Sequence, residues 1–287
     1  HCSKLSSLVL PSSITLGDYS FGYCTSLASL SLPSDITLGN NDFVSCDALT
    51  DIALGTGCTA YELVDSGLYS IHEASKELTL LFYPSGKTGN YTVSDNTVSI
   101  SDYAFYHSSL TSITIPSTVT SIGLSDYHVF DGASKLTSIN VSADNTLFKS
   151  TDGILCSINT VDDETTTVLL AYPSGLTATS FTVPDPVDSI GTSAFAETKA
   201  LTEVNIPKAT SQVGQYSFYK CTNLININVA DDNETLFDID GVLGNIFLDV
   251  PSLQLYPLGK TSDTYSVPTK FASISPYAFE DCKLNEI

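Results

Sequence analysis

A repeat of about 22 residues constrains the fold of this chain more than any other sequence feature. Successive copies begin at Leu5, Leu27 and Leu49, which lie 22 residues apart, and close copies return at Leu110 and Leu201. A single unit of this length cannot bury its apolar side chains alone, whereas a neighbouring unit covers its open face and pairs with its strand edges. The chain is therefore predicted to be an array of stacked coils.

Each coil carries three elements in a fixed order, which can be written L-x-x-I-x-I-P, V-T-x-I-G and A-F-x-x-C. The first element alternates apolar and polar residues, a pattern typical of a short strand with one buried face. Proline ends lateral pairing because it has no N–H, and glycine marks a turn. We expect the Ala-Phe pair to fill the convex side of the core before the cysteine closes the lap.

Three coils depart from the plain repeat in the same way. Each has an aromatic residue, a D-x-G or D-G step, two short apolar runs around a polar turn, and Y-P-x-G. Two apolar runs around a polar turn predict a protruding β-hairpin, near residues 61–87, 148–176 and 237–260. The aspartates of the D-x-G and D-G steps are interpreted as turn formers, and they are Asp65, Asp152 and Asp240.

After each hairpin we expect the chain to resume with YTV, FTVP or YSVP and to complete the same lap through the next Ala-Phe pair. Two further laps are expected to deform locally. Residues 125–129 lengthen one lap, and the lap from Leu49 lacks the I-P step. The three Ala-Phe pairs are Ala104-Phe105, Ala194-Phe195 and Ala278-Phe279.

The order I-x-I-P, V-x-x-I-G, A-F-x-x-C, with D-G and Y-P-x-G in the hairpin units, resembles the BspA-like leucine-rich-repeat family. The resemblance covers essentially all of residues 1–287 and implies a single, mostly β leucine-rich-repeat solenoid. Such a solenoid has short parallel strands on its concave face, turns, short strands or 3-10 segments on its convex face, and β-hairpin insertions. It also implies a microbial cell-surface or secreted protein with roles in adhesion and protein binding, and no catalytic residues.

Composition excludes several classes of partner. The chain has 11 Lys and Arg against 32 Asp and Glu, a formal net charge of -21, and its lysines are isolated. Nucleic acids and anionic membrane surfaces both need clustered basic residues. No apolar run is long enough to span a bilayer. The chain opens on His1-Cys2 and contains no Met, so we expect it to be a fragment of a longer polypeptide.

Seven cysteines raise the question of disulfides or metal sites. Cys2, Cys24 and Cys46 lie 22 residues apart, so stacked coils would bring them within the reach of a disulfide. Free buried thiols are the preferred interpretation, because cysteine packs well as a small core residue. No C-x-x-C motif occurs, which argues against zinc.

Catalysis is not expected. The four histidines are scattered, and the chain has no G-x-S-x-G, H-E-x-x-H or P-loop motif. A spatial Ser/His/Asp arrangement and an enzyme built on a parallel β-helix stay open as alternatives. No cofactor is predicted.

Two kinds of modification or metal site are weighed against simple turns. Asp144, Asp231 and Asp232 precede hairpin units and are weak calcium candidates, although such turns usually close with their own side chains. Three N-x-S/T sequons would accept glycans only in a eukaryotic secretory route, and they begin at Asn90, Asn140 and Asn233.

Small polar residues are predicted to face outward from the strands, where a solenoid usually binds its ligands. The leading hypothesis is a non-catalytic extracellular or cell-surface module that binds protein or glycan. The alternative is a structural building block of a surface layer, sheath or filament that self-associates, with ice binding more remote. The candidate binding residues are Ser29, Ser31, Thr111, Thr114, Thr137, Asn140, Thr202, Asn205, Asn226 and Asn228.

Overall fold

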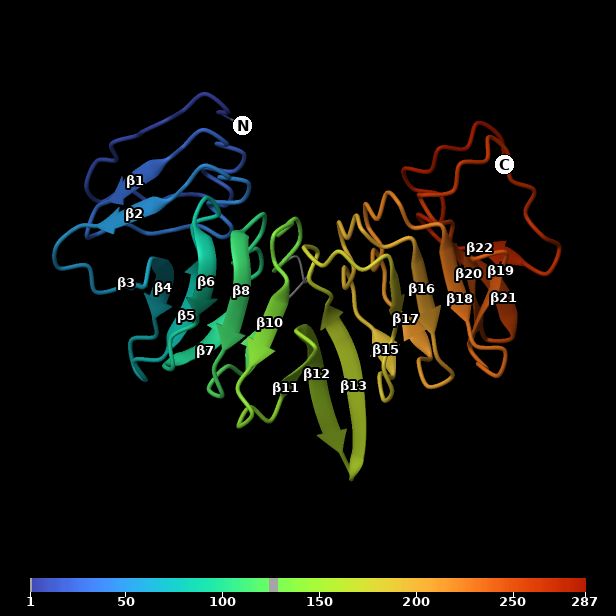
Figure 1. The fold of residues 1–287 in the computed structure, drawn as a ribbon. Helices are drawn as coiled ribbons and strands as arrows, with labels where there is room; N and C mark the ends of the chain where they lie inside the picture. Colours follow the sequence, from blue (N-terminus) through green and yellow to red (C-terminus); the bar gives the residue numbers. More distant parts are fainter. Residues whose placement is uncertain (1, 124–128) are drawn as a thin grey trace. The chain divides into compact units, whose positions relative to one another are not determined.

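A computed structural model describes residues 2–123 and 129–287 of the chain (Figure 1). Within these ranges the fold is a mostly β solenoid of about 11 turns without a helix, as predicted. The chain divides into two compact units, unit 1 at His1–Leu155 and unit 2 at Cys156–Ile287. The lengthened lap at residues 125–129 lies largely outside the described ranges. No helix in the described part is long and apolar enough to span a membrane.

The first apolar segment of most laps forms a first strand that pairs in parallel with its neighbours, and the segments at Val9 and Thr264 pair through isolated parallel bridges. In unit 1, β1 (Ser29–Leu32) pairs with β2 (Asp51–Leu54), and β6 (Thr88–Thr92), β8 (Ser109–Ile115) and β10 (Ser138–Val141) form a second parallel sheet. In unit 2, the corresponding sheet contains β14 (Ser180–Thr182), β16 (Glu203–Ile206) and β18 (Asn226–Val229).

Alternation along the first strands separates the core from the surface. In β1, Leu30 and Leu32 are buried while Ser29 and Ser31 are exposed. The register places Leu30 beside Ile52 of the next lap, so apolar residues stack upon apolar residues. A buried leucine stabilises the fold by about 1.5–3 kcal/mol, and a slip by one residue would expose the whole row.

The V-T-x-I segment forms a short second strand in many laps, and in the first two laps it makes an isolated bridge between Thr15 and Thr37. In unit 1 these strands include β7 (Thr97–Ile100) and β9 (Ser121–Ile122), which pair in parallel. In unit 2 they include β15 (Ser189–Ile190), β17 (Gln212–Val213) and β22 (Ser273–Ile274). Two ladders therefore hold each stack of coils together, one from the first strands and one from the second.

The predicted hairpins are present, but each is part of a larger antiparallel meander (Figure 1). In unit 1, β3 (Tyr61–Val64) pairs with β4 (Gly67–Ile71), which pairs with β5 (Leu78–Phe82). In unit 2, β19 (Leu236–Ile239), β20 (Val242–Phe247) and β21 (Val250–Leu255) repeat this arrangement. The remaining hairpin joins β12 (Ile154–Val161) to β13 (Glu164–Ala171), after β11 (Phe148–Thr151) at the end of unit 1.

The D-x-G and D-G steps are turns, as predicted, and each connects two strands. Asp65 and Ser66 both have positive φ angles, 46° and 77°, and Asp240 and Gly241 have 52° and 74°. Two successive left-handed residues are characteristic of the type I′ turn, whose twist matches that of an antiparallel strand pair. Asp152, with φ 51°, starts the equivalent turn after β11.

The predicted route of the chain after each hairpin was wrong. The backbone N–H of Tyr83 donates to the carbonyl of Ala104 at 2.9 Å, so the tyrosine of Y-P-x-G occupies the Ala-Phe step of its own lap. Tyr172 and Tyr256 make the same bond to Ala194 and Ala278. β5 pairs with β7 and is therefore the second strand of its lap. YTV, FTVP and YSVP consequently begin the next lap instead of completing the old one.

An aromatic column and a thiol column fill the A-F-x-x-C arches. The rings of Phe21 and Phe43 stack at 5.9 Å, and those of Phe195 and Phe218 at 5.0 Å. The thiol of Cys46 donates to the carbonyl of Phe21 at 3.2 Å. No disulfide joins the cysteines in the described ranges, and Cys24 and Cys46 are buried as predicted, whereas Cys2 is exposed.

The lap from Leu49 is not deformed in its first strand, contrary to expectation. β2 pairs with β1 residue by residue. Gly55 takes the place of the usual proline, and a Cβ there would lie 2.5 Å from the backbone nitrogen of Ser34. Glycine therefore keeps the spacing of the coils without the proline.

Candidate binding surfaces

The outer side of the first-strand sheet in unit 2 presents two rows of polar side chains, which we call the polar face of unit 2. Parallel pairing places Glu203 between neighbours on the two adjacent strands, and Asn205 likewise. Buried Val204 separates the two rows and points to the core. The rows are Ser180, Glu203 and Asn226, and Thr182, Asn205 and Asn228.

Hydrogen bonds connect the polar face across the strands. The Asn228 amide donates to Asn205 Oδ1 at 2.8 Å, and the Asn205 amide donates to Glu203 Oε1 at 3.2 Å. Ser180 donates to the same carboxylate at 3.0 Å. The bonds from Asn205 and then Ser180 lower the pKa of Glu203 below its usual value. The network holds a carboxylate and several amides in place on a half-buried face of the sheet.

Unit 1 carries an equivalent surface, the polar face of unit 1, on β6, β8 and β10. Asn90, Thr92 and Asn140 are exposed there, and Thr114 is half-buried between Thr92 and Asn140. Further along unit 1, Ser29 lies beside Asp51 and Ser31 beside Ala53. The rows on β6, β8 and β10 are Asn90, Ser112 and Ser138, and Thr92, Thr114 and Asn140.

Three of the predicted threonines contribute to stacking. Thr111, Thr137 and Thr202 lie at the entrance of the first strands, and each hydroxyl donates at 3.0 Å to a backbone carbonyl of the preceding lap. These hydroxyls are therefore less available to a ligand. The sequence analysis missed Ser112, Ser138, Thr182 and Glu203. Each lies next to a buried strand residue, so strict alternation of inward and outward side chains would have found it.

The acidic turns are not brought together as a metal site. Asp144 is exposed, and Asp232 pairs with Lys208 at 3.4 Å. Across the described ranges, no group of three His, Cys, Asp or Glu residues could hold a metal ion. The neighbouring asparagine instead joins successive laps. Asn145 is buried and donates to the carbonyls of Pro116 and Val119 at 3.0 and 2.9 Å.

The three sequons differ in accessibility. Asn90 and Asn140 are exposed on the polar face of unit 1. Asn233 is half-buried, and its amide donates to the carbonyls of Pro207 and Thr210 at 3.0 and 2.8 Å. Its oxygen accepts from the N–H groups of Thr235 and Leu236. The structure therefore speaks against glycosylation of Asn233 in the folded chain.

His107 packs as part of an arch. Its Nδ1 lies 3.2 Å from Asp47 Oδ1, and its ring stacks on Tyr106 at 4.3 Å. A Cβ at Gly132 would lie 2.0 Å from the ring. These contacts give His107 a packing role.

The sequence profile described as the BspA type leucine rich repeat region matches in six copies, at residues 1–64, 79–164 and 171–239. This is well over half of the chain. The chain belongs to the BspA-type leucine-rich-repeat family. No curated protein matches its sequence.

Solved structures share the fold at low sequence identity. A leucine rich cell surface protein from Faecalibacterium prausnitzii is similar with a TM-score of 0.54 and 18% identity, over 99% of this chain and 87% of that chain. The pneumococcal vaccine antigen PcpA is similar with a TM-score of 0.50 and 16% identity, over 90% of this chain and 49% of that chain. These likenesses establish the fold.

Proposed function

We propose that this chain is a non-catalytic extracellular or cell-surface module that binds protein or glycan ligands through its polar faces. We also propose that residues 1–287 form one continuous solenoid, because the repeat continues on both sides of residue 155. The observation that carries the binding proposal is the pair of registered polar rows on β14, β16 and β18. Family membership and the description of the Faecalibacterium protein as a cell surface protein support it.

The polar face of unit 2 suits recognition through hydrogen bonds. Asn226 and Asn228 are half-buried on the outer side of β18, and each amide can donate as well as accept. Glu203 adds a carboxylate whose position is fixed by its neighbours. Prepositioned groups lose little side-chain entropy on binding. Such a surface fits the hydroxyl groups of a glycan or the backbone of a protein.

An array of glycans and matrix proteins, probed with the labelled 287-residue chain, tests the proposal. Asn205→Arg places a long cation at the centre of the polar face and should abolish the signals of the wild type. Ala272→Arg is the matched control, because Ala272 is exposed beside β22 in the same unit. Equal loss in both variants, or signals that survive Asn205→Arg in a folded protein, would refute the role of the polar face.

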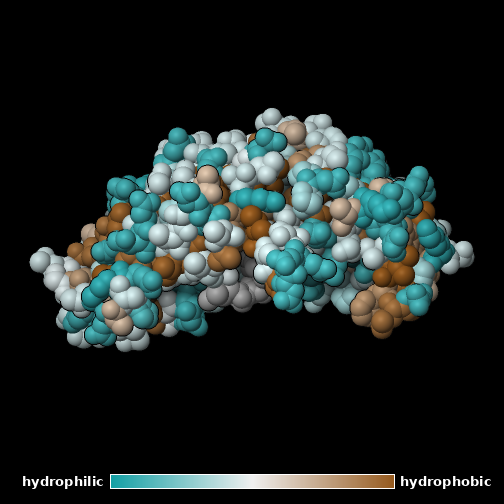
Figure 2. Space-filling model, turned by 90° about the horizontal axis from the view of Figure 1, so that it is seen from below, coloured by the Kyte–Doolittle hydropathy of each residue, from teal (hydrophilic) through white to brown (hydrophobic). Residues whose placement is uncertain are grey.

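One observation favours the alternative, assembly of copies of the chain into a surface layer or filament. The tip of the β20–β21 hairpin exposes apolar side chains around its Leu248-Asp249 turn: Phe247 is 68% exposed and Leu248 80% exposed, with Ile246 and Val250 beside them. Leu248 also has a positive φ of 49°, a conformation that costs a leucine about 1–2 kcal/mol. Figure 2 shows hydrophobic side chains gathered on the right of the view, the side where Figure 1 draws these strands.

The comparison with the β12–β13 hairpin sharpens this alternative. The corresponding turn there is Asp162-Asp163, which is polar and also left-handed. Folding alone would favour the polar turn at both places. Sedimentation of Leu248→Asn together with Phe247→Ser should show a shift to monomer if this tip joins copies, with Val161→Ser as the control. A wild type that is monomeric at all concentrations would exclude the alternative.

A further inference from the structure

The meander of unit 2 interrupts the ladder of second strands. β17 pairs with β15, and β21 pairs with β20 and β22, so the second strands of two successive laps, β17 and β21, do not pair with each other. A side chain bridges the two strands there: the Gln254 amide donates to the carbonyl of Val213 at 2.6 Å. A space opens between the arch that follows β17 and the arch that follows β22.

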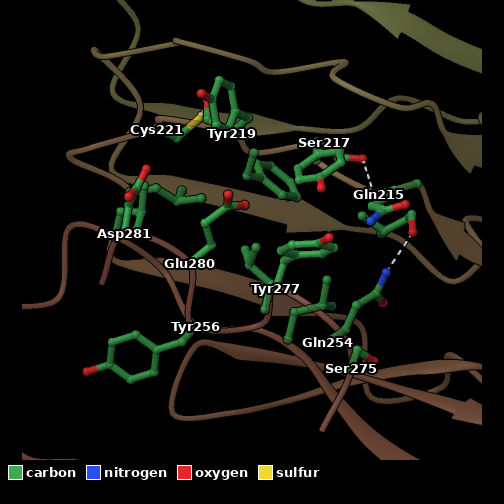
Figure 3. Close-up of a pocket in the computed structure, with 18 of the residues that line it drawn as sticks. Gln215, Ser217, Tyr219, Cys221, Gln254, Tyr256, Ser275, Tyr277, Glu280 and Asp281 are labelled. Atoms are coloured by element: carbon green, nitrogen blue, oxygen red, sulfur yellow. Dashed lines mark hydrogen bonds between the residues drawn. The ribbon is translucent and has the colours of Figure 1, made fainter. Parts of the chain in front are cut away.

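This space is a cleft of about 260 Å³, which we call the arch cleft of unit 2. Its floor includes Leu243 and Leu255 from the meander. Figure 3 shows one wall formed by Gln215 to Cys221 and the other by Ser275 to Asp281, with the ring of Tyr277 between the walls. Pockets for drug-sized molecules are about 300–1,000 Å³, so this cleft matches a single side chain or a small group.

Tyrosine rings and carboxylates line the arch cleft of unit 2. The rings of Tyr216 and Tyr277 lie 5.4 Å apart, and that of Tyr219 lies 6.2 Å from Tyr216 at 82°. Tyr277 is 57% exposed, so its ring is accessible. Glu280 and Asp281 are exposed on the same wall. Aromatic faces and carboxylates both attract cations.

One ammonium group already uses a ring of this cleft. The Nζ of Lys220 lies 4.9 Å from the centroid of Tyr219. The same Nζ lies 3.4 Å from Glu197 Oε1, so the carboxylate of Glu197 balances the charge of Lys220. Glu280 and Asp281 therefore keep their charges for another group.

Unit 1 has a cleft of the same origin beside β5, with a volume of about 380 Å³. Tyr103 precedes the Ala-Phe pair there, as Tyr277 does in unit 2, and its ring lies 6.4 Å from that of Tyr19. Asp18, Asp42 and Asp102 also line it, and its lining contains no Lys, Arg or His. Tyrosines combined with carboxylates thus recur where a meander interrupts the second ladder.

We propose that the arch cleft of unit 2 binds a lysine or arginine side chain presented by a protein partner. The cleft has the size of one side chain, tyrosine faces for the cation and its methylene stem, and two carboxylates for its charge. The net charge of -21 steers a basic partner toward the protein. The inference rests on the proposed binding function and assigns a second contact to the protein ligand, apart from the polar faces.

Nuclear magnetic resonance titration of the full chain with capped tripeptides tests this assignment. The probes are acetyl-Gly-Lys-Gly-amide, the arginine equivalent, and an uncharged norleucine equivalent of similar shape, with methyl glucoside as a fourth. The basic peptides should shift the signals of Tyr216, Tyr277 and Glu280 with a Kd on the order of 1 mM or below. Norleucine should bind at least about fivefold more weakly, as expected when a cation–π contact is removed.

Variants locate the binding within the cleft. Tyr277→Ala should weaken lysine binding about 3- to 30-fold, and Glu280→Gln should weaken it and reduce its salt dependence. Tyr23→Ala is the matched control and should change nothing, because Tyr23 is 45% exposed and has the same φ of 63° as Tyr277, but lies in unit 1. Equal binding of norleucine, a preference for methyl glucoside, or lysine binding unchanged in Tyr277→Ala would overturn the assignment.

The Asn205→Arg variant separates this inference from the proposed function. Peptide binding in Asn205→Arg should equal that of the wild type, because Asn205 lies outside the cleft lining. Loss of array signals with normal peptide binding confirms both sites. Normal peptide binding with unchanged array signals refutes the polar face alone, and absent peptide binding refutes the cleft alone.

Discussion

The hydroxyl of Tyr69 lies 2.6 Å from the hydroxyl of Tyr91 inside the core of unit 1. Tyr69 belongs to the meander strand β4, and Tyr91 belongs to β6, the first strand of the next lap. Tyr91 also donates to the carbonyl of Val64 at 3.3 Å, and Tyr69 accepts from the N–H of Ser94. This pair joins the meander to the regular coil.

Removing both hydroxyls should cost less than the sum of the two single removals. Tyr91→Phe leaves the Tyr69 hydroxyl and the Val64 carbonyl short of partners and should lower the free energy of unfolding by about 1–3 kcal/mol. The double variant Tyr69→Phe with Tyr91→Phe should be less destabilised than the two single effects combined. Urea unfolding measures both, with Tyr23→Phe as an exposed control. Additive losses would show that the hydroxyls do not interact.

The same pair makes stability depend on alkaline pH. Burial raises the pKa of Tyr69, and burial together with Tyr69 raises that of Tyr91. Because both folded pKa values exceed the unfolded value of about 10, the stabilisation is complete below pH 10 and is lost as the pH rises above it. The free energy of unfolding should therefore begin to fall near about pH 10 and continue to fall as the pH rises, and it should fall less in the double Phe variant. An equal decline in both proteins would count against this explanation.

Cysteine reactivity should follow burial. Burial raises the pKa of the Cys46 thiol to about 12, so only about one molecule in ten thousand carries the thiolate at pH 8. Iodoacetamide should label exposed Cys2 in the native chain and label Cys46 only after unfolding. Peptide mass spectrometry reports each site. Rapid labelling of Cys46, or a mass increase on reduction that reveals a disulfide, would contradict the free buried thiol.

Glycines at the same place in successive laps should respond differently to alanine. A Cβ at Gly39 would lie 2.5 Å from the backbone carbon of Gly17, whereas a Cβ at Gly17 meets nothing within 4 Å. Gly39→Ala should therefore lower the free energy of unfolding by about 1–3 kcal/mol, and Gly17→Ala should change it little. Thermal unfolding compares them. Equal effects would mean that the coils are not packed as closely as described.

The asparagine of each acidic turn should matter more than its aspartates. Asn233→Ala removes an amide that makes bonds to four backbone groups and should destabilise unit 2 by about 2 kcal/mol or more. Asp231→Ala, at an exposed position, should have little effect. Circular dichroism during heating gives both values. An Asn233→Ala variant as stable as the wild type would contradict this structural role, and with it the argument against glycosylation of Asn233.

The sequence predicted the fold well because the repeat determines it. Alternating Leu30 and Leu32 gave the strand, its buried face and its register with the next lap. The meanders were predicted less well, because local apolarity cannot distinguish an inserted hairpin strand from β5, which also serves as the second strand of its lap. The bond from the Tyr83 N–H to the Ala104 carbonyl shows that Tyr83, and not the Ala104-Phe105 pair, completes the lap that contains the meander.

The candidate site was predicted in part for a similar reason. Asn205 and Asn228 follow from strict alternation, but Thr111 and Thr202 were misjudged because polarity alone does not show which hydroxyls bond to the preceding lap. The arch clefts were not foreseen. They arise from missing pairing between distant segments, such as β17 and β21, which no local pattern contains.

The side-chain amide signals of Asn205 and Asn228 test the central claim most directly. These two amides are joined at 2.8 Å on the polar face of unit 2. Titration of the ¹⁵N-labelled chain with the strongest ligand from the array should shift both amide signals in proportion to occupancy, and Asn205→Arg should abolish the titration. Unshifted Asn205 and Asn228 amides in a chain saturated with ligand would contradict a binding role for the polar face.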